Sequence, residues 1–272
     1  MQKLVEAIKV GDVSRILEIL QSNQPLDFSF DDNIVIRLAI KQRIPPEVIR
    51  LIVNHPDYLK LTRFKHLSII LASSTGYLEA VQTLLQCPHI DPVDNDNFSL
   101  ELAAHNGHIE IVKLLISDPR VNSTIGNCHV MGAEAKGGHL EIIEYLLANT
   151  PASTKYSIRG AIDGNHLFLV ERLLNDPRFD PTEGDITAIE VATDNKNIQG
   201  LELLLNDSRV NPAVHNNSAL LRAVYRRNIA AIKRLLLDPR VDPFDKNGSI
   251  IEVAKDIPDK QYILMLLQSR QI

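Results

Sequence analysis

The sequence predicts an all-α solenoid of about nine helix-turn-helix units joined by short extended loops. Three repeating features of the 272 residues carry this prediction. Turns are evenly spaced, a pair of aliphatic residues follows each turn at a fixed distance, and a small residue usually precedes it. Self-similarity at a fixed period is typical of solenoids, in which each unit packs only on its neighbours.

The turns fall near positions 11, 44, 76, 107, 138, 165, 196, 227 and 258. Most intervals are 31 residues long, and the interval between 138 and 165 is 27. The eighth and ninth residues after each turn are aliphatic in all nine units, and the fourth residue before it is alanine in seven. We therefore expect a single repeat domain over residues 1–272, with the first and last units acting as caps.

The first helix of a unit shows an apolar stripe of small residues, as in Leu100, Ala103 and Ala104. Residues spaced i, i+3, i+4 share one helix face, so small side chains there let neighbouring helices pack closely. Hydroxyl residues stand where this helix is expected to begin, and we predict them to be N-caps. They are Ser68, Ser99, Ser157, Thr187, Ser218 and Ser249.

The second helix carries a longer stripe, and we predict that it ends at Asp118-Pro119 because proline cannot continue a helix. The same ending recurs as DPR at 176–178 and 238–240 and as DSR at 207–209. Short extended pieces are expected after it, at Val121-Asn122, Phe179-Asp180, Val210-Asn211 and Val241-Asp242.

Helix, tight turn, longer helix and loop in this order resemble the ankyrin repeat, whose period is about 33 residues. The stretches AAHNGHIEIVKLL (103–115) and GGHLEIIEYLL (137–147) carry the resemblance. The family's Thr-Pro-Leu-His signature is absent, the nearest segment being FSLELA (98–103), and Asp-Pro-Arg replaces the usual glycine turn. We therefore expect the loops to differ from those of the family. NTPASTKYS (149–157) predicts a dent in their row, which we interpret as a tolerated deletion rather than a functional change of curvature.

Composition and motifs exclude several function classes. A net charge of −5 is not typical of a general nucleic-acid binder, and no apolar run approaches the length of a membrane span. Cys87 and Cys128 fit no metal or redox spacing, which indicates a reducing compartment, the cytoplasm or alternatively the nucleus. His108, His139 and His166 recur at the turn, where the family uses histidine structurally. We expect no catalytic residues, no metal and no cofactor, and we expect a monomer.

The resemblance places partner contacts on the loop tips and the exposed side of each first helix. Those positions are Asp94, Asn95, Asn97, His105, Asn106, Lys136, Asp163, Asp194, Asn195, Tyr225 and Arg226. Arg222, Arg226 and Arg227, with Lys233 and Arg234, also form a basic cluster in the eighth unit. A solvated face explains such a cluster, and the alternative is one pole of a charged groove whose acidic pole includes Asp94.

The sequence thus predicts a non-catalytic scaffold or adaptor that binds a protein partner through its concave face. Two alternatives stay open. The chain could be the targeting subunit of a larger effector or ubiquitin-ligase-type assembly, or a passive structural spacer.

Overall fold

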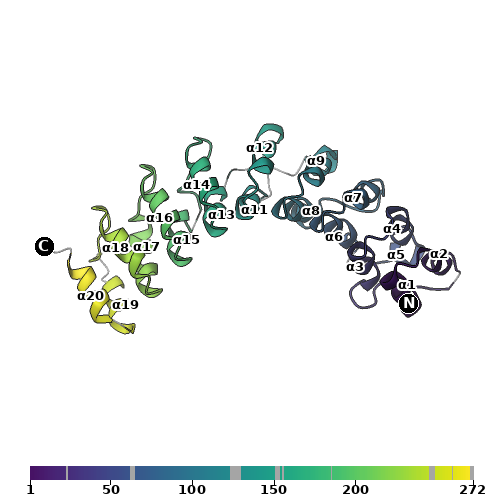
Figure 1. Cartoon of the computed structure of the whole chain (residues 1–272), viewed down its shortest axis with the longest axis horizontal. Helices are drawn as coiled ribbons and strands as arrows, with labels where there is room; N and C mark the ends of the chain where they lie inside the picture. The colour runs from purple at the N-terminus through teal and green to yellow at the C-terminus, as the bar shows by residue number, and fades with distance from the viewer. Residues whose placement is uncertain are drawn as a thin grey trace. The chain divides into compact units, whose positions relative to one another are not determined.

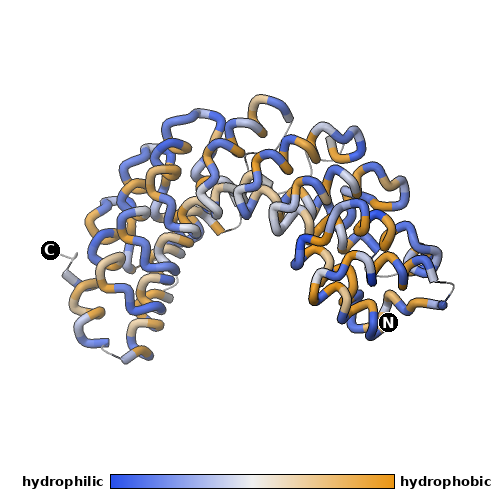
Figure 2. The backbone as a smooth tube through the Cα atoms, turned by 45° about the vertical axis from the view of Figure 1, so that its right-hand side comes forward, coloured by the Kyte–Doolittle hydropathy of each residue, from blue (hydrophilic) through white to orange (hydrophobic). Residues whose placement is uncertain are grey.

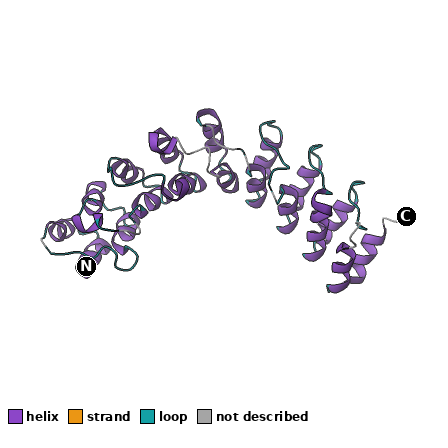
Figure 3. Cartoon of the chain, turned by 180° about the vertical axis from the view of Figure 1, so that it is seen from behind, coloured by secondary structure: helices purple, strands orange, loops and turns teal. Residues whose placement is uncertain are grey.

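The computed structural model describes residues 1–22, 24–61, 65–122, 130–150, 154, 156–184, 186–244, 249–258 and 260–269. Within these ranges the regular structure is entirely helical, as Figure 3 shows. Apart from the four-residue helices α5 and α10, the described helices follow one another along the chain as nine successive pairs, which confirms the predicted fold class. The chain divides into two compact units, which we describe separately, and a single domain over residues 1–272 stays a prediction.

The first unit comprises residues 1–130 and 141–153. Its first helices, α1, α3, α6 and α8, lie side by side in one row, and its second helices, α2, α4, α7 and α9, lie in another (Figure 1). The helices of this unit are α1 (Gln2–Val10), α2 (Val13–Gln21), α3 (Ile34–Lys41), α4 (Pro46–Val53), α5 (Pro56–Leu59), α6 (Leu67–Ser74), α7 (Leu78–Leu85), α8 (Asp94–His105), α9 (Ile109–Ser117), α10 (Pro119–Asn122) and α12 (Leu140–Asn149).

The second unit comprises residues 131–140 and 154–272. First helices α13, α15, α17 and α19 stack in one row, and second helices α14, α16, α18 and α20 stack in the other. The helices of this unit are α11 (Val130–Gly137), α13 (Ser157–Asp163), α14 (Leu167–Leu174), α15 (Ala188–Asp194), α16 (Ile198–Leu205), α17 (Val214–Tyr225), α18 (Ile229–Leu236), α19 (Ser249–Asp256) and α20 (Lys260–Gln268).

The repeat positions read from the sequence are core positions. All seven of the recurring alanines are buried: Ala7, Ala72, Ala103, Ala161, Ala192, Ala223 and Ala254. The first aliphatic residue of the pair is also buried in most units, as at Leu84, Leu115 and Leu204. Burying a leucine side chain stabilises a fold by roughly 1.5–3 kcal/mol, so this regular register supplies much of the packing energy. Helices of both units carry hydrophobic and hydrophilic residues (Figure 2).

The turn between the helices of a pair is bonded to the preceding repeat. His108 Nε2 lies 3.2 Å from the Ser74 carbonyl oxygen, and His166 Nε2 lies 2.9 Å from that of Lys136. Tyr77 donates from its hydroxyl to the Ile44 carbonyl at 2.9 Å. His108 and His166, two of the histidines at the turns, therefore have a structural role.

The loop after the second helix is bonded in a similar way. Arg120 pairs with Asp118 within its own loop and donates to the carbonyl oxygens of Leu85 and Ile90 in the repeat before. Arg209 repeats this arrangement with Leu174 and Phe179. The Asp-x-Arg motif at 118–120 and 207–209 thus connects each loop to the repeat before it.

Several local predictions were wrong. Among the predicted caps whose side chains the structure describes, only Thr187 is an N-cap; Ser68, for example, lies inside the first turn of α6, which begins at Leu67. Ser157 begins α13, whereas Ser99 and Ser218 follow three left-handed residues within α8 and α17. The side chain of Ser249 lies outside the described residues.

The predictions for the ends of the second helices are partly confirmed and partly wrong. Helix α9 ends at Ser117 as predicted, but Val121 and Asn122 belong to the short helix α10 and are not extended. Residues 151–153 and 155 of the shortened stretch NTPASTKYS, on which the predicted irregularity depends, lie outside the described residues.

Candidate protein-binding surface

The first helices of the second unit are connected by a row of polar side chains, which we call the polar ladder. It consists of Lys136, Asp163, Asn195, Asp194, Arg222 and Arg226. Lys136 Nζ lies 2.7 Å from Asp163 Oδ2, and Asn195 donates from Nδ2 to Asp163 Oδ1 at 2.8 Å. The bond to Lys136, more than the one to Asn195, lowers the pKa of Asp163 below its usual value. Three successive repeats are therefore joined through one carboxylate.

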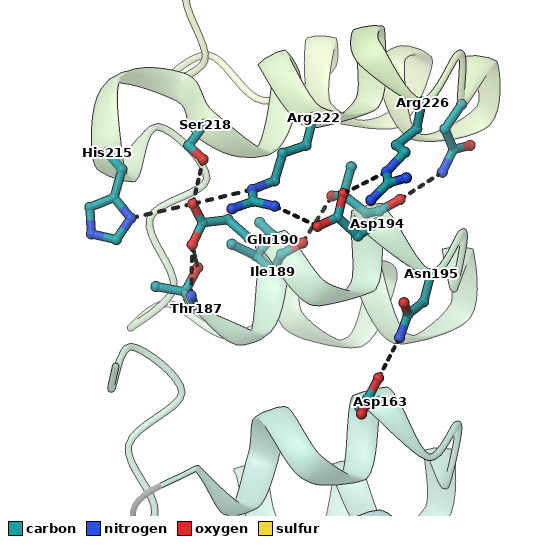
Figure 4. Close-up of polar contacts among 12 residues, drawn as sticks. Asp163, Thr187, Ile189, Glu190, Asp194, Asn195, His215, Ser218, Arg222 and Arg226 are labelled. Atoms are coloured by element: carbon teal, nitrogen blue, oxygen red, sulfur yellow. Dashed lines mark hydrogen bonds and ion pairs between the residues drawn. The ribbon is translucent and has the colours of Figure 1, made fainter. Parts of the chain in front are cut away.

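The ladder continues at Asp194, whose two carboxylate oxygens bind different arginines of α17. Arg222 Nη1 lies 2.5 Å from Oδ2, and Arg226 Nε lies 3.2 Å from Oδ1 (Figure 4). These pairs fix the orientation of two long side chains that stay partly exposed. Restricting them before a partner arrives reduces the entropy cost of binding.

A buried carboxylate, Glu190, lies at the base of the ladder. It accepts hydrogen bonds from the Thr187 backbone N–H at 2.6 Å and from the Thr187 and Ser218 hydroxyls. Arg222 Nε lies 3.8 Å from it. Burial raises the pKa of Glu190, but the hydrogen bonds from Ser218 and Thr187 outweigh burial, and the net pKa is lowered. An ionised Glu190 therefore helps to hold Arg222 in place (Figure 4).

Sequence reasoning missed Glu190, although a signal for it existed. Thr187 and Glu190 form a capping box. The side chain of each residue accepts a hydrogen bond from the backbone N–H of the other, at the start of α15. A Thr-x-x-Glu spacing at a helix start predicts this arrangement. The sequence contains it at 187–190.

At the end of α17 the ladder meets an exposed aromatic residue. Tyr225 is 68% exposed, and Arg226 and Arg227 beside it are also exposed. An exposed tyrosine next to arginines is the composition found at the energetically dominant positions of protein interfaces.

The remaining predicted contact residues belong to the first unit. Asp94 is half-buried, and Asn95 and His105 are exposed. Asn106 is exposed and donates from Nδ2 to the Ser74 and Leu102 carbonyl oxygens. Asn97 is only 2% exposed, because the left-handed run of residues 95–97 within α8 turns it inward, so its side chain is not on the surface.

The predicted basic cluster is divided between two helices. Arg222 and Arg226 lie on or next to α17 and pair with Asp194. Lys233 and Arg234 lie on the second helix α18, where Lys233 Nζ is 5.6 Å from the centre of the Tyr262 ring. The cluster is therefore not one basic surface, since two of its arginines are paired and two other cations belong to the second-helix row.

Among the described residues, no group of three or more histidine, cysteine, aspartate or glutamate side chains is arranged to hold a metal ion. Cys87 is buried, and burial raises the pKa of its thiol. Cys128 lies outside the described residues. None of the helices in the described ranges combines the length and apolar character that a bilayer span requires.

Comparison with known families agrees with this geometry. The family model "Ankyrin repeat" matches residues 95–125, which hold most of α8, the turn and all of α9. Residues 95–125 are an ankyrin repeat. This match supports the ankyrin-repeat family for the chain, and the helix pairs of both units are consistent with an ankyrin-type helical solenoid. Ankyrin repeats are generally non-catalytic protein-interaction modules. No curated protein matches the chain.

Proposed function

We propose that this chain is a non-catalytic scaffold or adaptor that binds a protein partner through the polar ladder and the adjoining end of α17. The observation that supports it best is the position of Tyr225. This side chain is 68% exposed and directly precedes Arg226, which an ion pair with Asp194 orients. A rigid aromatic residue beside an oriented guanidinium makes a favourable contact at low entropy cost.

The same surface would serve a targeting subunit of a larger assembly, because both roles need a specific protein contact. A passive spacer needs none. We place the working compartment in the cytoplasm, with the nucleus as the alternative, on the basis of the cysteine content. We propose that the chain is monomeric and needs no cofactor.

Photo-crosslinking tests the proposal with a matched control inside the second unit. A photoreactive phenylalanine analogue replaces Tyr225 in one variant and Phe168 in the other. Phe168 is 73% exposed but lies on α14, in the row of second helices. In cells, the variant with the analogue at 225 should crosslink to a discrete protein, and the variant with it at 168 should not.

Two outcomes would contradict the proposal. Equal crosslinking from both positions would indicate non-specific contact. A discrete partner from neither position would favour a passive spacer. Circular dichroism should show the same helical content for both variants, so that a difference reflects position and not folding.

A further inference from the structure

The turns of the second unit form a second feature beside the polar ladder. Asn165, Lys196 and Arg227 occupy the same place in three successive repeats, and each has a left-handed backbone, with φ of 58°, 57° and 53°. We call these three residues the turn row. Asn197 donates to the Ile162 carbonyl at 3.2 Å and Asn228 to the Thr193 carbonyl at 3.3 Å, so neighbouring turns are bonded to one another.

A hollow of about 610 Å³ opens between the first two of these turns. Its polar lining is Asp163, Asn165, Asn195, Lys196, Asn197 and Gln199. The Asp163 carboxylate in this lining already binds Lys136 and Asn195. The exposed Lys196 is the cation of the hollow.

Charge along this surface favours an acidic ligand. Lys196, Arg226 and Arg227 are all exposed, on a chain whose net charge is −5. The nearby carboxylates, Asp163 and Asp194, each accept from two partners within the protein. The carboxylates near these cations are therefore already engaged within the protein, and the cations can attract an acidic segment. This charge complementarity would also accelerate association of the segment.

The spacing of the turns suggests the backbone form of that segment. Packed helices lie roughly 8–10 Å apart, and the turns that end successive first helices should repeat at that distance. A polyproline II helix has three residues per turn and rises about 3.1 Å per residue, so its residues i and i+3 face the same side about 9 Å apart. A β-strand would place residues i and i+3 on opposite faces.

We propose that the turn row and its hollow bind an extended acidic segment of a protein partner in the polyproline II form. Carboxylates at i and i+3 contact Lys196 and Arg227, and the exposed ring of Tyr225 packs against an intervening proline, since aromatic residues commonly line polyproline II grooves. This inference rests on the proposed function and specifies its partner. A nucleic acid fits less well, because a chain with a net charge of −5 is not typical of a general nucleic-acid binder.

Binding of synthetic peptides to the full chain tests this proposal. The probe is a fluorescein-labelled twelve-residue peptide, proline-rich, with glutamate at every third position. One control peptide has the same composition with its glutamates adjacent, and another has lysine in place of glutamate. We expect the spaced acidic peptide to bind roughly tenfold more tightly than the adjacent-glutamate peptide, and the lysine peptide not to bind.

Charge reversal assigns the site. The double variant Lys196→Glu/Arg227→Glu should weaken binding of the spaced peptide by roughly tenfold or more. The matched control is Lys9→Glu/Lys41→Glu, which reverses two exposed cations in the last turns of first helices α1 and α3. This control should bind as the unmodified chain does, and both variants should keep their helical circular dichroism.

Three results would overturn the inference. They are equal loss in the two double variants, equal binding of both acidic peptides, and tight binding of an oligothymidylate in place of the spaced peptide. If the peptides fail but the crosslinker at 225 still captures a protein, the partner class is wrong and the proposed scaffold function stands. If both experiments fail, both proposals fall.

Discussion

The first helices of the two units are connected across repeats by different kinds of bond. In the first unit, Arg43 donates to the Thr75 carbonyl and Asn106 to the Ser74 carbonyl, both at the C-terminal end of α6. In the second unit, Lys136 pairs with the Asp163 side chain, and Arg222 pairs with that of Asp194. A backbone carbonyl is available at every position, whereas a side-chain pair needs two matching residues in neighbouring repeats.

The turn and loop bonds, in contrast, are shared by both units. Tyr77 and His108 have their counterparts in His166, Asn197 and Asn228, and Arg120 has its counterpart in Arg209. This comparison separates the two classes of polar residue. Bonds common to both units maintain the repeat, and the polar ladder of the second unit is added on top of it.

The largest effect is expected where the backbones of two first helices touch. A Cβ atom at Gly160 of α13 would lie 2.2 Å from the Gly132 carbonyl oxygen of α11. Gly160→Ala should therefore lower the free energy of unfolding by about 1–3 kcal/mol, although alanine in a helix is otherwise favoured over glycine by about 1 kcal/mol. Urea denaturation followed by circular dichroism measures the change.

Gly132→Ala is the control for this substitution. Its Cβ would lie 3.3 Å from Tyr156 Cβ, a tight but adjustable contact, so we expect a change of less than about 1 kcal/mol. A stabilising effect of Gly160→Ala would mean that α11 and α13 do not approach closely. The difference between the two units would then lack a structural basis at Lys136 and Asp163, where the polar ladder begins.

The repeat could be predicted from the sequence because the same positions are buried in each repeat. The recurring alanines are all buried, and α9 ends where proline requires it. The pairing within the ladder was not predictable from the period. Lys136 and Asp163 are 27 residues apart, since four residues are missing between their repeats, whereas Asp163 and Asn195 are 32 apart.

The burial of individual polar residues also could not be predicted from the sequence. Asn97 belongs to a run of three left-handed residues, and backbone of that kind turns a loop-tip asparagine into the interior. Lys233 follows Arg227 by only six residues, yet it falls on the second helix and therefore leaves the predicted cluster. In both cases a short change of backbone direction decides the environment, and residue type alone does not encode it.

An intermediate effect is expected in the loops, and it should be the same in both units. Arg120→Ala and Arg209→Ala each remove two bonds to carbonyl oxygens of the preceding repeat, and each should cost about 1–2 kcal/mol. Arg240 donates to one such carbonyl, that of Val210, so Arg240→Ala should cost about half as much. Urea midpoints of the three variants give the ranking. Equal losses in all three would show that the arginines act through their own aspartates and not across repeats.

The smallest effect is expected in the polar ladder itself. Lys136 and Asp163 are 53% and 36% exposed, and an exposed ion pair contributes about 0.2–1 kcal/mol. Lys136→Ala should therefore lower the free energy of unfolding by less than 1 kcal/mol, and raised salt should reduce the difference further. The measurement is a pair of urea titrations at low and high sodium chloride concentration.

The pH dependence of this small loss is a second check. Because Lys136 lowers the pKa of Asp163 in the folded protein, the pair's contribution is present above the usual aspartate pKa of 3.8 and is lost as the pH falls through the lowered value. The unmodified chain and Lys136→Ala should therefore converge in stability below about pH 4. A loss of stability larger than about 2 kcal/mol, or one insensitive to salt and acid, would show that the polar ladder mainly stabilises the fold. A small loss of stability that salt screens would mean that the polar ladder contributes little to folding. Side chains that are oriented but contribute little to folding make a surface suited to binding a partner.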